Sequence, residues 1–156
     1  MMLRFLHWLS SKLRVRRIFG EDGTLYLERF KLFGWMPGDS RRYPFSIYLH
    51  RFHRPDLDDA PHSHPWKWAF SIILAGGYWE ARPIEHGATE LRPLRAGSTN
   101  FLRDDSFHLV TQLVGRETWT LFIVGPKTSS WGFLVPGRGV VPWRDRLRER
   151  GLEVPY

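Results

Sequence analysis

Short apolar runs separated by turn residues dominate the hydrophobic pattern of this chain. The runs are rich in aromatic and β-branched residues, and clusters of Gly, Pro, Asn and Asp lie between them, which is typical of strands joined by turns. The pattern predicts strands over residues 24–33, 45–52, 66–74, 78–83, 89–94, 98–102, 107–114, 118–124 and 131–135. Roughly ten short strands at nearly even spacing predict an all-β fold, either a sandwich or a barrel.

Three local features of this pattern make more specific predictions. The Asp22-Gly23 pair is typical of a hairpin turn. The run 66–74 is too apolar for a half-exposed strand, so we expect it at the centre of a sheet with both faces covered. The runs 107–114 and 118–124 are separated by a short turn at Gly115-Arg116, which predicts that they pair as a hairpin.

Both ends of the chain carry helical signals. Apolar residues recur at helical spacing over residues 1–17, at Met2, Phe5, Leu6, Leu9 and Leu13, which predicts an amphipathic helix. Such a basic helix can lie on a membrane surface, but we favour a helix that covers a sheet edge or packs on a second subunit. A second helix is predicted over 144–150, stopped by Gly151. The expected organisation is an N-terminal helix (1–17), a β domain (18–143) and a C-terminal helix with its tail (144–156).

Composition excludes several classes of protein. The chain has 156 residues and no cysteine, so disulfides and thiolate metal sites are excluded, and a cytoplasmic protein is expected. The net charge of +7 permits contact with nucleic acid or an anionic membrane, but basic residues concentrate only in the first 17 residues and after Arg144, so neither contact is favoured. No apolar run approaches the ~20 residues needed to span a bilayer, and no signal peptide is recognised.

The densest chemistry lies in Pro61-His62-Ser63-His64-Pro65. Residues i and i+2 of an extended segment share one face, so His62 and His64 present two imidazoles side by side. His108 is the candidate for a third. Three neutral imidazoles suit a divalent transition metal such as Fe, Zn, Ni or Mn, with Co and Cu also compatible. The alternative is a pair of loop histidines together with a core histidine bonded to a backbone carbonyl.

Further residues are candidates for support of this group. Asp59, His50, Glu80 and Asp105 are each either an additional ligand or a residue that orients a ligand. Candidates for a ligand pocket are large aromatic and cationic side chains that lie near the histidines or in neighbouring strands. They are Trp66, Trp68, Trp119, Arg51 and Arg103. The alternative for the tryptophans is plain core packing, and for the arginines a solvated sheet face.

The histidine segment, followed by an apolar strand and Gly76-Gly77, and later by Gly97 and His108, resembles the two-part metal motif of the cupin superfamily. A closer likeness is to small cupin-like proteins of bacteria and phages, carried by Tyr48-Leu49-His50-Arg51-Phe52, His64-Pro65-Trp66 and Gly125-Pro126-Lys127. The resemblance covers residues 18 to 145. It implies a cupin-type double-stranded β-helix, or jelly roll, with a three-histidine site. The glutamate of the first motif is replaced here, because Trp68 and Ala69 stand where it is expected.

Three hypotheses about function follow. The first is a metal-dependent cupin enzyme acting on a small molecule, such as a dioxygenase or isomerase, with His62, His64 and His108 as metal ligands. The second is a jelly roll that binds a small ligand or a partner without catalysis, because the motif glutamate is replaced. The third is a basic, phage-type accessory protein that uses its two ends for interaction. A homodimer is also expected.

Overall fold

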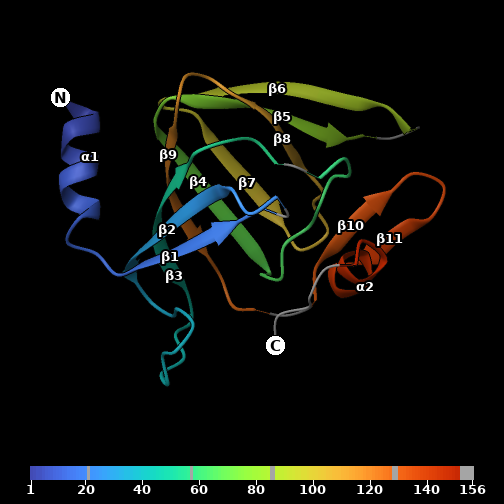
Figure 1. The fold of residues 1–156 in the computed structure, drawn as a ribbon, viewed down its shortest axis with the longest axis horizontal. Helices are drawn as coiled ribbons and strands as arrows, with labels where there is room; N and C mark the ends of the chain where they lie inside the picture. The colour runs from blue at the N-terminus through green and yellow to red at the C-terminus, as the bar shows by residue number, and fades with distance from the viewer. Residues whose placement is uncertain (21, 57, 85–86, 128–129, 152–156) are drawn as a thin grey trace.

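In the part of the chain that the structure describes, three antiparallel sheets and two short helices make up the fold (Figure 1). The computed structural model describes residues 1–20, 22–56, 58–84, 87–127 and 130–151. The strands are β1 (Val15–Phe19), β2 (Leu25–Phe33), β3 (Ser46–Phe52), β4 (Trp68–Ala75), β5 (Gly77–Pro83), β6 (Thr89–Arg95), β7 (Thr99–Arg103), β8 (Leu109–Leu113), β9 (Thr118–Val124), β10 (Gly132–Val135) and β11 (Gly139–Pro142). The prediction of an all-β fold with short terminal helices is confirmed.

The chain crosses repeatedly between two of these sheets. The largest sheet has the order β1-β2-β3-β9-β4-β7, and a second has the order β6-β5-β8. The chain therefore leaves the large sheet after β4, returns at β7, leaves again at β8 and returns at β9. The third sheet, β10-β11, lies beside α2 in Figure 1. Because β4 lies between β9 and β7, its predicted internal position is correct. One of its faces is buried and the other is only half-buried, so the expectation of two covered faces is met in part.

The predicted hairpin at Gly115-Arg116 is wrong. Strand β8 pairs with β5, whereas β9 pairs with β3 and β4. The short turn instead carries the chain from one sheet to the other, and Gly115 has the positive φ of 90° that such a sharp reversal requires. A turn signal shows where a chain reverses, but it does not show whether the two strands share hydrogen bonds. The other predicted turn, at Asp22-Gly23, does join two paired strands, β1 and β2.

The first helix is shorter than predicted. Helix α1 spans Met2–Ser10, and the end of the predicted helix is strand β1. The β-branched side chains of Val15 and Ile18 favour the extended form, and β1 gains a full ladder with β2. Helix α2 spans Trp143–Glu149, within one residue of the prediction, and β11 was not expected. The predicted C-terminal tail beyond Gly151 lies outside the described residues. No helix in the described ranges is both long and apolar enough to cross a membrane.

The two faces of the large sheet belong to different packing clusters. On the outer face, Leu6 of α1 packs with Phe30, Leu49 and Trp119, all buried. Cross-strand pairing places Tyr48 and Phe122 opposite each other on the inner face, where Trp66 packs against them. Alternation along each strand separates the two clusters. The inner face is therefore the one that meets the histidine segment.

Candidate metal centre

Backbone pairing brings the two halves of the histidine group together. The N–H of His62 donates to the carbonyl of His108 at 2.9 Å, and the N–H of His108 donates to the carbonyl of His62 at 3.0 Å. On its other side the segment is tied to β10, where the N–H of Ser63 donates to the carbonyl of Gly132 at 2.9 Å. The His-Ser-His segment thus behaves as a short extra strand, which is the conformation that directs both rings to one side.

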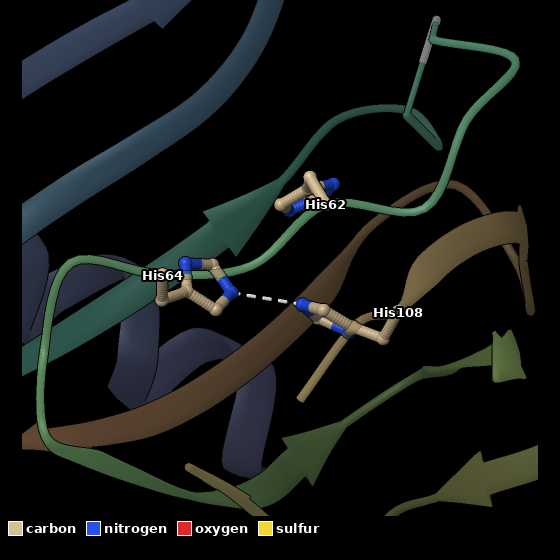
Figure 2. Close-up of side chains that lie close together, drawn as sticks. All are labelled: His62, His64 and His108. Atoms are coloured by element: carbon tan, nitrogen blue, oxygen red, sulfur yellow. Dashed lines mark hydrogen bonds between the residues drawn. The ribbon is translucent and has the colours of Figure 1, made fainter. Parts of the chain in front are cut away.

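The three histidine rings lie around one point (Figure 2). One ligand nitrogen from each of His62, His64 and His108 lies within 4.8 Å of the others. The closest pair joins His64 Nε2 and His108 Nε2 at 2.8 Å. The His62 ring centroid is 4.9 Å from that of His108 and 5.2 Å from that of His64. His108 is buried, and the other two are half-buried.

A buried carboxylate sets the tautomer of His108. Glu80 on β5 is fully buried, and its Oε1 lies 2.7 Å from His108 Nδ1. An ionised carboxylate can only accept, so His108 donates from Nδ1 and its Nε2 carries a lone pair. Glu80 also accepts from Asn100 Nδ2 at 2.7 Å and from Arg82 Nε at 2.9 Å. The lone pair of His108 therefore points toward His64.

The short contact between His64 and His108 fits two ligands of one cation. Two nitrogens that bind the same ion at about 2.1 Å lie roughly 3 Å apart when they subtend a right angle at it. The observed 2.8 Å is close to that value. Without a cation, one of the two nitrogens must carry a proton, and that proton would have to belong to His64.

Burial keeps the imidazoles of His62 and His64 neutral. It lowers the pKa of His62 to about 4, against the ordinary value of 6.5. The pKa of His64 is lowered well below 6.5, first by burial and then by its neighbours His108 and His62. For Glu80 burial raises the pKa, but the hydrogen bonds from His108 and Asn100, with the charge of Arg82, outweigh it and lower the pKa to about 2. Neutral imidazoles beside an ionised carboxylate are the protonation states that metal binding requires.

Asp56 lies near His62 and was missed by the sequence analysis. Its Oδ2 is 3.9 Å from His62 Nδ1 and accepts the N–H of Val110 at 2.7 Å. Its Oδ1 accepts from the hydroxyl of Tyr26. His62 Nδ1 faces this carboxylate, which leaves Nε2 as the nitrogen available for a ligand. No sequence signal separates Asp56 from the neighbouring acids Asp58 and Asp59.

The prediction that Asp59 supports the histidines does not hold. Its carboxylate accepts from Arg146 Nη2 at 2.6 Å and from Arg150 Nη2 at 3.1 Å. Asp58 contacts the same two arginines at 3.5 and 3.3 Å. Both acids point to α2 and its C-terminal cap, because two cations there neutralise them. They connect the histidine segment to the end of the chain.

The remaining predicted residues have different locations. His50 is buried on the inner face of the sheet, where it accepts from Arg29 Nε at 2.9 Å, and it is not part of the three-residue group. Asp105 is exposed in the turn after β7. Of the predicted support residues, Glu80 is therefore the one that contacts a histidine of the group.

Of the five predicted pocket residues, Trp66 stacks on His64, with ring centroids 5.5 Å apart. Trp119 is fully buried on the outer face beside α1, so its expected role in a pocket is wrong. Arg51, from the same face, pairs with Glu117. The indole of Trp68 packs against the backbone of Gly125, and Arg103 is exposed. Alternation predicts which residues share a face, but not which face lies inside.

A cleft of about 220 Å³ adjoins the histidine group at His62. Its walls are largely aromatic, with Phe19, Tyr26, Trp131 and Phe133 among the lining residues. Asp56 also lines it, so a small molecule in the cleft would contact both a carboxylate and the outermost histidine. The cleft comes from segments far apart in the chain, which is why sequence patterns did not reveal it.

Comparison with solved structures identifies the fold. The chain aligns with a cupin-2 domain from Rhodospirillum rubrum at a TM-score of 0.57 and 10% identity, over 80% of this chain and 76% of that one. The polyketide cyclase RemF from Streptomyces resistomycificus aligns at a TM-score of 0.53 and 18% identity, covering 83% and 85% of the two chains. FeII HppE in complex with substrate aligns at a TM-score of 0.55 and 13% identity, over 74% of this chain.

These likenesses show that the chain has the cupin jelly-roll fold, as the sequence resemblance implied. The chain spans 57% of the length of HppE. No protein-family model and no curated protein matches the sequence. The chain is therefore a cupin-fold protein in which three histidines from two segments form a compact group. The closer likeness to small bacterial and phage proteins stays a prediction.

The neutral histidines predict that metal-free protein loses stability in mild acid. Below pH 6.5 an unfolded His62 binds a proton that the folded form, with its pKa of about 4, still excludes, so stability falls as the pH drops from 6.5 toward 4. Glu80 adds a second loss of stability as the pH falls further, and this loss begins near the ordinary pKa of 4.5. Urea unfolding with EDTA should give a lower free energy of unfolding at pH 5 than at pH 7, and a smaller difference in His62→Asn. Equal stability at the two pH values would contradict this account.

Replacement of Glu80 by Gln should weaken metal binding by about 10- to 100-fold. The amide keeps the shape of the side chain and can still accept from His108 Nδ1, but it removes the negative charge that strengthens His108 as a ligand. Competition with a chromogenic zinc chelator measures the affinity. The matched control is Glu90→Gln, which removes an exposed carboxylate from β6. Wild-type affinity in Glu80→Gln would refute the role of this carboxylate.

Proposed function

We propose that the chain binds one divalent transition metal through His62, His64 and His108 and uses it in a reaction of a small molecule. The observation that carries the proposal is the 2.8 Å approach of His64 Nε2 to His108 Nε2. Because the Nδ1 proton of His108 is held by Glu80, the Nε2 lone pair is directed into the group. A histidine that binds a metal needs such a free lone pair on the nitrogen that faces the ion.

The donor set fits a reactive rather than a structural metal. Three protein ligands leave positions for water and substrate. Neutral imidazoles add no charge, so a bound cation keeps its full Lewis acidity, and a redox-active one can also support oxygen chemistry. Glu80, outside the group, contributes a fixed negative charge beside His108.

The protein residues around the group have separate roles in this proposal. Glu80 holds the proton on His108 Nδ1, and Asp56 faces His62 Nδ1 at 3.9 Å. Trp66 stacks on His64 and restricts its rotation. The aromatic walls of the cleft at His62 exclude water from a bound molecule and offer flat surfaces for packing. His108 and His64 thus each have one neighbour that restrains the orientation of the ring.

We place an oxygenase first among the reaction types, with iron as the first metal. All three ligands are imidazoles, which suit Fe(II) as well as Zn or Ni. A structure of HppE that contains Fe(II) has the same fold. An isomerase-type activity with zinc is the second choice. The predicted homodimer, cytoplasmic location and small-molecule partner stay predictions.

The second candidate function is binding without catalysis. It is favoured by the absence of a carboxylate from the three-residue group within the described part of the chain. The positions where the cupin motif has its glutamate are Trp68, which packs on Gly125, and Ala69, which is buried in the core. Such a protein would hold the metal or a ligand but consume no co-substrate.

Elemental analysis of untagged protein purified without chelator tests the proposal. We expect close to one Fe, Zn, Ni or Mn per chain, and its loss in the double variant His62→Ala/His108→Ala. The control is His7→Ala/His53→Ala, because neither residue belongs to the group. Metal-dependent oxygen uptake would support the oxygenase, and a full metal site without turnover would support the binding protein. No metal after purification and none after titration would refute the metal centre and leave only the second candidate, a jelly roll that binds a ligand or a partner without a metal.

A further inference from the structure

Arg29, on the inner face of the large sheet, is held in an unusual way. It lies directly opposite His50 across β2 and β3, and its Nε donates to His50 Nε2 at 2.9 Å. Its guanidinium carbon lies 5.2 Å from the Tyr48 ring and 5.5 Å from the Trp66 ring. Two aromatic rings and one histidine therefore hold the cation in a defined position.

No carboxylate neutralises this cation. Within the described ranges, no Asp or Glu oxygen lies within 4.0 Å of Arg29, and its two terminal nitrogens make no hydrogen bond. Three other arginines in the strands are paired: Arg17 with Glu28, Arg51 with Glu117, and Arg82 with Glu80. A half-buried guanidinium without an anion is energetically unfavourable, so its occurrence beside a ligand group needs an explanation.

A second arginine increases the imbalance of charge. Arg16 on β1 pairs directly with Arg29 across the β1–β2 ladder. Like charges in this position repel each other and destabilise a sheet. Arg16 is exposed, and no acidic side chain pairs with it in the part of the chain that the structure describes. Burial lowers the pKa of Arg29 to about 10, so its side chain remains cationic at neutral pH.

The aromatic contacts place Arg29 beside the histidine group. Trp66 packs against Arg29 and also stacks on His64, at an interplanar angle of 28°. The charge of Arg29 is one of the causes that lower the pKa of His64. Arg29 therefore adjoins the group at His64, whereas the cleft adjoins it at His62.

We propose that Arg29, assisted by Arg16, binds the oxyanion of the small molecule that the metal centre acts on, either a carboxylate or a phosphate. The planar guanidinium offers two parallel N–H donors that match an oxyanion, and the aromatic rings orient it while its terminal nitrogens stay available. The link to the reaction rests on the proposed function, but the anion site itself does not. The substrate class is then a small organic acid or phosphate ester rather than a neutral apolar compound.

Anion titration of metal-free protein tests the site without the metal. Inorganic phosphate and, separately, acetate are titrated into EDTA-treated, dialysed protein at low ionic strength, and backbone amide NMR shifts report binding. We expect saturable shifts in residues of β2 and β3, with affinity reduced at least tenfold in Arg29→Gln and less in Arg16→Gln. Tighter binding of phosphate would indicate a phosphate ester, and tighter binding of acetate a carboxylate.

Two further variants make the result decisive. Arg95→Gln removes an exposed arginine from β6 and should bind like the wild type, which excludes a general effect of charge. Arg29→Lys keeps the charge but lacks the planar pair of N–H donors, so we expect an affinity between those of the wild type and Arg29→Gln. If Arg29→Gln fails to fold, Arg29→Lys takes its place in the test. Wild-type affinity in both Arg29 variants, or no saturable binding by the parent, overturns the proposal.

Metal content separates this proposal from the function on which it rests. Arg29→Gln should retain its metal while losing phosphate, because Arg29 is outside the three-histidine group. Phosphate binding by a parent protein that takes up no metal would refute the metal centre and leave the anion site standing. Metal uptake without anion binding would refute the anion site and leave the metal centre standing.

Discussion

The buried negative charge of Glu80 is the constraint on which the histidine group depends. A carboxylate in a protein interior is stable only when hydrogen bonds and opposite charges surround it. Here Asn100, Arg82 and His108 provide them. These partners come from β7, from β5 itself and from the segment before β8, so one carboxylate connects two sheets. The same charge determines which nitrogen of His108 faces His64.

The C-terminal helix supports the histidine segment. Asp58 and Asp59 precede the histidine segment and pair with Arg146 and Arg150. Trp143, at the start of α2, stacks on Trp131 with ring centroids 5.6 Å apart, and Trp131 in turn lines the cleft beside His62. The C-terminal helix is therefore part of the architecture that positions the histidines.

The sequence was sufficient to predict the histidine group. The i, i+2 spacing of His62 and His64 specifies a shared face once the segment is extended, and His108 is the remaining histidine at the start of a strand. The fold class followed from the even spacing of strands and turns, and its cupin form followed from the resemblance. The shared face of His62 and His64 and the fold class depend on local geometry, which short stretches of sequence determine, whereas the cupin form depended on the resemblance.

Features that depend on long-range pairing could not be predicted in this way. Alternation along β2 assigns Arg29 to one face of the sheet. Which face is the inner one depends on how α1 and Trp66 pack against the sheet. Asp56 is one of three nearby acids, and the backbone N–H of Val110, far along the chain, distinguishes it. The first three residues of β1, Val15 to Arg17, fall within the predicted N-terminal helix, because the pairing of β1 with β2 is not visible in a local pattern.

Anomalous X-ray diffraction at the absorption edge of the bound metal tests the central claim most directly. Crystals of protein loaded with one equivalent of Fe(II) or Zn should give one anomalous peak per chain. We predict that it lies about 2.0–2.2 Å from one nitrogen each of His62, His64 and His108. A peak at any other position, or none in protein shown by elemental analysis to carry the metal, would contradict the account.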